Sequence, residues 1–301
     1  MVDGTTGRFA QGRVARARWC AVLAALCVTG VAAVYVVAVR TFRGQVLETT
    51  AMNGRAVQPK KLGEAAQGLL GTVSVASLAI LMAIVLSVAL IRRNVRLAGV
   101  VAFIVAGSIV TTEVLKLKLL RRPQLNVYGD PTTPFNTLPS GHTTVAMCVV
   151  VALILVVPRR SQGIVALLGA PYPIGIGIAT VIAGWHRPSD VLAGCLVVGA
   201  WTFGGLLVLN ALGAMEPEVR RPWERFIAPA IVVGLVLSVI ALATTTLYGV
   251  RIHYRPIGVL GSRGALKPAI AFGFSTASIA TVATLIIGSL LWILRDVRLG
   301  R

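Results

Sequence analysis

Long runs of apolar residues, separated by short polar connections, constrain this chain more than any other feature. A helix that spans a bilayer needs about 20 mostly apolar residues. The runs of that kind are roughly 19–39, 69–91, 97–115, 141–157, 164–184, 191–212, 227–249 and 269–294. Because they are continuous and lack the alternation of membrane strands, we expect an all-α polytopic membrane protein with about eight transmembrane helices. Pro171 and Pro173 predict a kink or break in the fifth span.

The composition supports this fold class and excludes others. Hydrophobic residues make up 56% of the chain and charged residues 13%, whereas a soluble domain carries about 25% charged residues. An ordinary soluble enzyme, a disordered chain and a coiled coil are therefore excluded. The net charge is +19, from 29 Lys and Arg against 10 Asp and Glu. Because the basic residues cluster between apolar runs, they indicate a membrane surface rather than nucleic acid as the partner.

The spans predict three regions and a topology. We expect a basic cytoplasmic tail over 1–18, a six-span core over 19–212, and two additional spans with an outer basic loop and a short cytoplasmic tail over 213–301. An even number of spans puts both termini on one side, and the positive-inside rule makes that side the cytoplasm. Arg outnumbers Lys 24 to 5, and Ala, Val and Gly are abundant, which fits a GC-rich bacterial genome. We therefore expect a multi-pass protein of a bacterial inner membrane. The connection 40–68 is expected to cap the outer surface.

Four cysteines lie inside apolar runs, none with the spacing of metal ligands, and are interpreted as small core residues. They are Cys20, Cys27, Cys148 and Cys195. No metal site, haem, flavin or nucleotide-binding loop is predicted from the sequence.

Residues suited to catalysis gather at the ends of the third to sixth spans. Lys116 to Pro123 follows the third span, Pro139 to His142 opens the fourth, and Trp185 to Asp190 precedes the sixth. Two spans separate the last two of these segments. Crossing the membrane twice returns the chain to the same face, so their side chains can converge whichever face is outside.

The basic residues and the glycine in these segments suit phosphate binding. Lys116 and Arg122 offer fixed positive charge, and an arginine can hold phosphate with two hydrogen bonds. Ser140 and Gly141 open a helix, where unpaired N–H groups and the helix dipole favour an anion. Gly141 also allows close approach of the backbone to an oxyanion. Glu113, near the end of the third span, is predicted to pair with Lys116 or another base.

The histidines suit phosphoryl transfer. His186 and Asp190 are four residues apart, so one helical turn would stack them. A carboxylate on Nδ1 holds an imidazole in one tautomer and raises its basicity. Such a histidine can attack phosphorus and form a covalent intermediate. His142 could then protonate the leaving oxygen as a general acid.

At these residues the sequence resembles the type 2 phosphatidic acid phosphatase (PAP2) superfamily. Its members include lipid phosphate phosphatases, bacterial undecaprenyl pyrophosphate and phosphatidylglycerophosphate phosphatases, and vanadium haloperoxidases. Its pattern has the parts K-x6-R-P, P-S-G-H and S-R-x5-H-x3-D. The second part is complete at Pro139 to His142, and H-x3-D is complete at His186 and Asp190. The resemblance implies a PAP2-like core over 19–212 and a metal-independent phosphatase without a cofactor.

The resemblance also implies a role for each matching residue. His186 would be the nucleophile, Asp190 its orienting partner and His142 the acid. The implied phosphate binders are Lys116, Arg122, Ser140 and the Gly141 amide.

The chain departs from the family pattern at two places. The first motif reads K-x5-R-P from Lys116, one residue short. The Ser-Arg pair is replaced by Ala179 and Thr180, so one arginine that binds phosphate in the family is missing. Arg187, beside the expected nucleophile, is a candidate replacement. Others that would share its face are Arg121, Arg251 and Arg255.

These observations predict a lipid phosphate or pyrophosphate phosphatase that acts at the outer face of the membrane. A lipid substrate follows from placement, because catalytic groups at helix ends near the headgroup level favour an amphiphile that enters laterally. One alternative is a phosphotransferase that uses the same site. Another is a non-catalytic lipid-binding or transport protein derived from the family. The sequence leaves the oligomeric state open.

Overall fold

The computed structural model describes residues 3–55, 60–71, 94–127, 135–218 and 268–300, with the isolated positions 73, 83 and 87. Helices account for most of the described chain. They are α1 (Asp3–Val34), the π-helical η1 (Tyr35–Val39), α2 (Phe42–Gly54), α3 (Lys60–Leu70), α5 (Val95–Val114), the π-helical η3 (Leu115–Leu119), α6 (Gly141–Val156), α7 (Arg159–Gly169), α8 (Pro171–Ala183), α9 (Pro188–Ala211) and α11 (Pro268–Leu294). Within the described residues, the strands are β1 (Met215–Pro217) and β2 (Val297–Leu299), which pair antiparallel.

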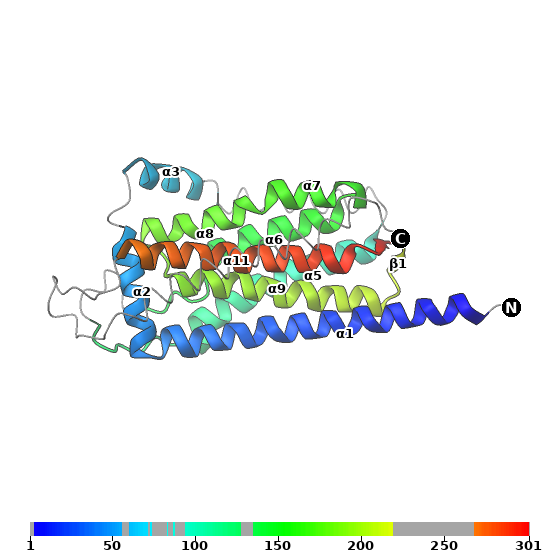
Figure 1. The fold of residues 1–301 in the computed structure, drawn as a ribbon, viewed down its shortest axis with the longest axis horizontal. Coiled ribbons are helices and arrows are strands. Elements are labelled where there is room, and N and C mark those ends of the chain that lie inside the picture. Colours follow the sequence, from blue (N-terminus) through cyan, green and yellow to red (C-terminus); the bar gives the residue numbers. More distant parts are fainter. Residues whose placement is uncertain are drawn as a thin grey trace.

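The long helices run side by side along the long axis of the molecule (Figure 1). The helix α9 contacts α1, α5, α6 and α11, so it forms the centre of the bundle. Figure 1 shows both chain termini at one end of the bundle, where β1 pairs with β2. The other end carries α2, which lies across the helix ends.

Five helical segments of the described chain are long and apolar enough to cross a membrane. They are Gln11–Val39, Val95–Leu119, Arg159–Ala183, Pro188–Ala211 and Ile270–Leu294, and the shorter apolar helix Gly141–Val156 joins them. These segments match six of the predicted spans, and they make the chain a multi-pass helical membrane protein. The predicted span 227–249, and most of 69–91, lie outside the described residues. The helix α1 begins at Asp3, so it continues through the basic segment that we expected to be a tail.

The predicted break in the fifth span is confirmed. The helix α7 ends at Gly169 and α8 begins at Pro171, which is its first residue. Proline is favoured there because the first turn of a helix leaves its N–H groups unbonded. The helix α8 ends at Ala183 and is capped by Gly184, whose φ of 79° is left-handed. Glycine adopts this conformation without strain, so the chain can turn directly from α8 toward α9.

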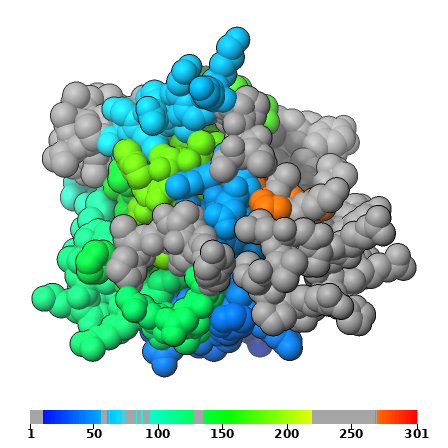
Figure 2. Space-filling model, turned by 90° about the vertical axis from the view of Figure 1, so that its left-hand side faces the viewer, coloured from blue at the N-terminus to red at the C-terminus, as the bar shows by residue number. Residues whose placement is uncertain are grey.

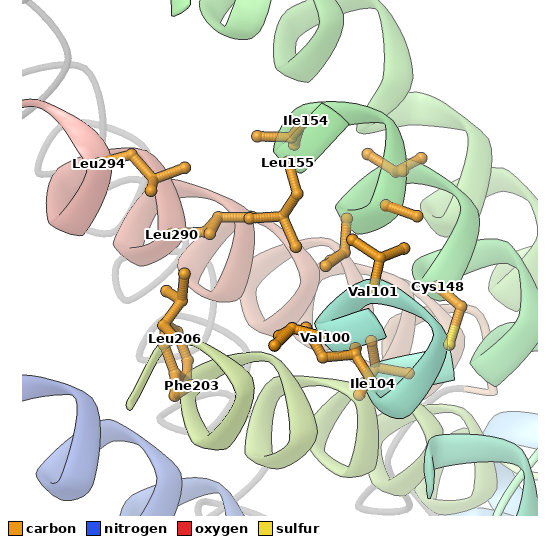
Figure 3. Packing of buried hydrophobic residues seen from close by; sticks show 14 of the residues in the cluster. Val100, Val101, Ile104, Cys148, Ile154, Leu155, Phe203, Leu206, Leu290 and Leu294 are labelled. Carbon is orange, nitrogen blue, oxygen red and sulfur yellow. The ribbon is translucent and has the colours of Figure 1, made fainter. Parts of the chain in front are cut away.

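A continuous apolar core joins α5, α6, α9 and α11 (Figure 3). Fully buried members include Ile104, Ile154, Leu206 and Leu290, one from each of these helices. Small residues allow the close approach, as in other membrane bundles. A Cβ atom added at Gly205 would lie 2.6 Å from the Ile104 side chain. The prediction that the four cysteines are core residues is confirmed, since all of them are buried and free.

The helix α2 is held across its end of the bundle by contacts at both of its ends. Thr41 caps α2, because its hydroxyl accepts a hydrogen bond from Gly44 N at 3.0 Å. A Cβ atom at Gly44 would overlap the Val37 carbonyl, and one at Gly54 would overlap the Pro268 carbonyl. Glycine at these positions therefore lets α2 pack closely against η1 and α11. Figure 2 looks onto this end and shows α2, in blue, near its middle.

Candidate active site

The three segments singled out in the sequence meet at the end of the bundle that α2 crosses (Figures 1 and 2). The first lies at and after η3, the second opens α6, and the third forms the turn from α8 into α9. The structure therefore brings together side chains that are separated by two crossings of the bundle.

His186 lies in the turn before α9 and is held by a carboxylate from the first turn of that helix. Its Nδ1 is 3.3 Å from Asp190 Oδ2. The same oxygen accepts hydrogen bonds from the Thr137 hydroxyl at 2.6 Å and from Arg187 N at 2.9 Å. Asp190 therefore caps α9 and contacts His186 at once.

The expected stacking over one helical turn is wrong in one respect. His186 precedes the helix, because Pro188 is the first residue of α9. Asp190 instead contacts His186 from the first turn. The backbone N–H groups of Trp185 and His186 both donate to the Thr180 carbonyl, at 3.0 and 3.3 Å, and this fixes the turn on the end of α8.

His142, the second residue of α6, faces the same space as His186. The centroids of the two imidazole rings are 6.1 Å apart, and the His142 ring is 5.4 Å from the Trp185 ring. The start of α6 is tied to α9 by the Ser140 N–H, which donates to the Asp190 carbonyl at 2.8 Å. A Cβ atom at Gly194 would lie 2.9 Å from the Ser140 carbonyl oxygen, so glycine permits this contact.

Ser140 is the N-cap of α6, and its hydroxyl is engaged in that cap. Its Oγ accepts hydrogen bonds from Thr143 N at 3.3 Å and from the Thr143 hydroxyl at 3.1 Å. The residue is fully buried. It therefore shapes the helix N-terminus, whose free N–H groups favour an anion.

Lys116 brings its ammonium group to this helix N-terminus. A Cβ atom at Gly141 would lie 3.8 Å from Lys116 Nζ and 3.6 Å from Glu113 Oε1. The prediction that Glu113 pairs with Lys116 is confirmed, with Nζ and Oε1 2.6 Å apart. The Asn136 side-chain amide fixes this segment, because it donates to the carbonyls of Lys116 and Leu138 at 3.2 and 3.1 Å.

Arg122 is nearly buried and pairs with a carboxylate that the sequence analysis did not identify. Its Nη1 is 2.9 Å from Glu48 Oε2, and both side chains are 5% exposed. The other oxygen of Glu48 accepts a hydrogen bond from Ser189 N at 3.1 Å. The scarcity of acidic residues, 10 in the whole chain, was the available signal for Glu48. Burial raises the pKa of Glu48 above its ordinary value, nearby Asp190 raises it further, and Arg122 lowers it.

Position 180, where the family carries arginine, holds a buried threonine. The Thr180 hydroxyl donates to the Gly177 carbonyl at 2.7 Å, within α8. A different guanidinium lies nearby, because a Cβ atom added at Gly184 would overlap that of Arg55. Arg55 follows α2 directly, and Gly184 precedes His186 by two residues. No motif marked Arg55, since the contact depends on how α2 lies across the bundle.

The four arginines suggested as replacements have different positions. Arg187 is buried at the N-cap of α9, and Arg121 is exposed. Arg251 and Arg255 lie outside the described residues.

The described site offers a ligand imidazole, ammonium and guanidinium side chains together with backbone N–H groups. Within the ranges that the structure describes, no group of three or more His, Cys, Asp or Glu residues could hold a metal ion. The arrangement suits an anion that is attacked by an oriented imidazole.

Comparison with known proteins points to the same segments. Residues 97–213 match the family model described as the PAP2 superfamily. A curated relative, named lipid A 1-phosphatase, of Rhizobium johnstonii is 39% identical over 67 residues. The alignment covers 22% of this chain and a quarter of the relative's length. No solved structure is significantly similar to the chain.

Proposed function

Because residues 97–213 match the PAP2 superfamily model, we propose that the chain is a membrane lipid phosphate phosphatase that works through a phosphohistidine. The observation that carries this proposal is the Nδ1 to Oδ2 contact of 3.3 Å between His186 and Asp190, beside the ring of His142. An oriented imidazole facing a second imidazole provides a nucleophile and an acid for one phosphoryl group.

The proposed reaction has two steps. His186 attacks phosphorus through Nε2 while Asp190 holds Nδ1–H. The bond from phosphorus to the leaving oxygen breaks, and His142 gives that oxygen a proton. A water molecule then attacks the phosphohistidine, returns a proton to His142, and releases phosphate with free His186.

The proposed oxyanion ligands come from three places. Lys116 and the Gly141 amide lie together at the N-terminus of α6. Arg122 approaches from the segment after η3, and Arg55 from the end of α2. Arg187 remains a proposed ligand from the start of α9. Positive groups aimed at the equatorial oxygens stabilise the charge of the transition state, so the proposed reaction requires no metal.

The proposed substrate is a lipid monophosphate or pyrophosphate. The site lies at the end of a bundle of membrane-spanning length, and the relative's printed name is that of a lipid phosphatase. We further propose that the described site faces outward from a bacterial inner membrane, with both termini in the cytoplasm. In this proposal, the core is 19–212 and the region 213–301 adds two spans.

The test is phosphate release by the purified protein in detergent, with excess chelator. The panel is phosphatidic acid, phosphatidylglycerophosphate and undecaprenyl pyrophosphate, and native protein is compared with His186→Ala. The proposal is supported if native protein releases phosphate from at least one lipid in the presence of chelator and His186→Ala does not. A folded native protein that releases no phosphate would instead favour a lipid-binding or transport role. Transfer of phosphate to an added lipid hydroxyl, in place of release, would identify a phosphotransferase.

A further inference from the structure

One buried carboxylate joins three elements of the site without belonging to the proposed chemistry. Glu48 lies on α2 and is buried. One of its oxygens accepts from Arg122 Nη1 at 2.9 Å, and the other accepts from Ser189 N at 3.1 Å. Ser189 directly precedes Asp190 in the first turn of α9. Glu48 thus links α2, the segment of Arg122 and the helix that carries Asp190.

Two residues that bond to Glu48, and the residue that follows it in α2, each have a buried polar side-chain atom without a hydrogen-bond partner among the described residues. These atoms are Arg122 Nη2, Ser189 Oγ and Thr49 Oγ1. A buried donor without a partner costs about 1–3 kcal/mol. Arg122 Nη2 therefore keeps its hydrogen-bonding capacity unused, while Nη1 is held by Glu48.

The same face of α2 also holds the residue after Arg122. Gln45 lies one helical turn before Glu48, and its side-chain amide donates to the carbonyls of Val39 and Pro123, at 2.8 Å each. The helix α2 therefore binds the segment after η3 at two points, the side chain of Arg122 and the carbonyl of Pro123. Residues three apart share a helix face, which lets one helix make both contacts.

We propose that Glu48 is a positioning residue, which holds the Arg122 guanidinium so that Nη2 faces the substrate phosphate. The inference rests on the proposed function. A carboxylate that competed with phosphate would take both Arg122 nitrogens in a bidentate pair. Glu48 contacts only Nη1 of the guanidinium, and its second oxygen accepts a hydrogen bond from Ser189 N. It therefore holds the arginine while leaving Nη2 open to phosphate. A buried ion pair adds little net stability over apolar packing, so stability alone is a weak reason for one here.

The experiment compares Glu48→Gln with native protein in orthophosphate affinity and in kcat and KM for the most rapidly hydrolysed lipid of the panel. Glutamine keeps the shape and one acceptor but removes the charge. We expect orthophosphate binding about tenfold weaker and KM about tenfold higher, with a smaller change in kcat. Glu64→Gln, an exposed glutamate on α3, removes the same charge elsewhere and should leave both constants unchanged. Gel filtration and thermal unfolding establish that each variant is folded.

Two further experiments distinguish a positioning role of Glu48 from a merely structural one. In an Arg122→Lys background, Glu48→Gln should add less than about a twofold effect, because both changes act on one interaction. The ratio of native to Glu48→Gln affinity should be largest at high pH. It should approach one as pH falls through the raised pKa of Glu48, which faces Arg122 and Asp190. Protonated Glu48 and glutamine then carry the same charge.

The outcomes are distinct from those of the proposed function. Equal orthophosphate affinity in native protein and Glu48→Gln, tighter binding by the variant, or additive effects with Arg122→Lys would each overturn the inference. Absence of lipid hydrolysis by native protein would overturn the proposed function, while the orthophosphate comparison would still test Glu48. If Glu48→Gln does not fold, Glu48→Asp takes its place. It keeps the charge on a shorter side chain, and affinity equal to native would then overturn the inference.

Discussion

The imidazole rings of His142 and His186 lie with their centroids 6.1 Å apart, although they open different helices of the bundle. His142 belongs to α6 and His186 precedes α9. The hydrogen bond from Ser140 N to the Asp190 carbonyl, 2.8 Å long, ties the two helix starts together. In the proposed reaction the two rings act on one phosphoryl group, and their separate roles can be tested.

His142→Ala should slow hydrolysis of lipid phosphates by about 10²–10⁴-fold, because the leaving alkoxide then lacks its acid. The loss should be much smaller with p-nitrophenyl phosphate, whose leaving group departs without a proton. His186→Ala should abolish hydrolysis of both substrates. Steady-state kcat/KM for the two substrates is the measurement, because it reports the steps up to departure of the leaving group and excludes the later step in which His142 takes a proton from water. An equal loss on both substrates in His142→Ala would contradict a role as general acid.

Asp190→Asn should lower kcat by about 10²–10⁴-fold while the protein stays folded. Asparagine keeps an oxygen that can accept a hydrogen bond from Arg187 N and cap α9, so the temperature of thermal unfolding should change little. It removes the charge that holds His186 Nδ1–H. Thr137→Ala, which loses the 2.6 Å hydrogen bond to Asp190, should cause a milder loss. If the unfolding temperature and kcat fall together, Asp190 acts only as a helix cap.

Gly141→Ala should fold normally and bind orthophosphate weakly. The added Cβ would meet Glu113 and Lys116 at 3.6 and 3.8 Å, which are ordinary contacts. It would, however, occupy space at the helix N-terminus where an oxyanion approaches. Gly99→Ala on α5, with no atom within 4 Å of the new Cβ, is the matched control. Unchanged orthophosphate affinity in Gly141→Ala would show that the anion binds elsewhere.

Arg55→Ala should raise KM for the lipid phosphate by about tenfold, because its guanidinium lies against Gly184, two residues before the proposed nucleophile His186. Arg55→Lys should restore only part of the affinity, since an ammonium cannot bind phosphate in a bidentate manner. Lys61→Ala removes an exposed positive charge from α3 and serves as the control. If Arg55→Ala and Lys61→Ala behave alike, Arg55 does not contact the phosphate.

Much of the architecture could be predicted from local patterns. Apolar runs of membrane-spanning length predicted the described spans, and Pro171 predicted the break between α7 and α8, because chain length and the missing N–H act locally. The segments of His142 and His186 could be placed on one face from the parity of the crossings alone. The pairing of Glu113 with Lys116 was also predictable, since residues three apart share a helix face.

The contacts of α2 were decided only by the tertiary structure. Nothing near Glu48 or Arg55 in the sequence indicates a site, because their partners Arg122, Ser189 and Gly184 lie far along the chain. Hydrophobic periodicity reports which segments are buried in a bilayer, but not how a polar connection lies over the helix ends. That placement depends on close backbone contacts at Gly44 and Gly54. The sequence alone thus determined the spans that the structure describes and the face of the candidate site, whereas long-range packing decided which charges surround it.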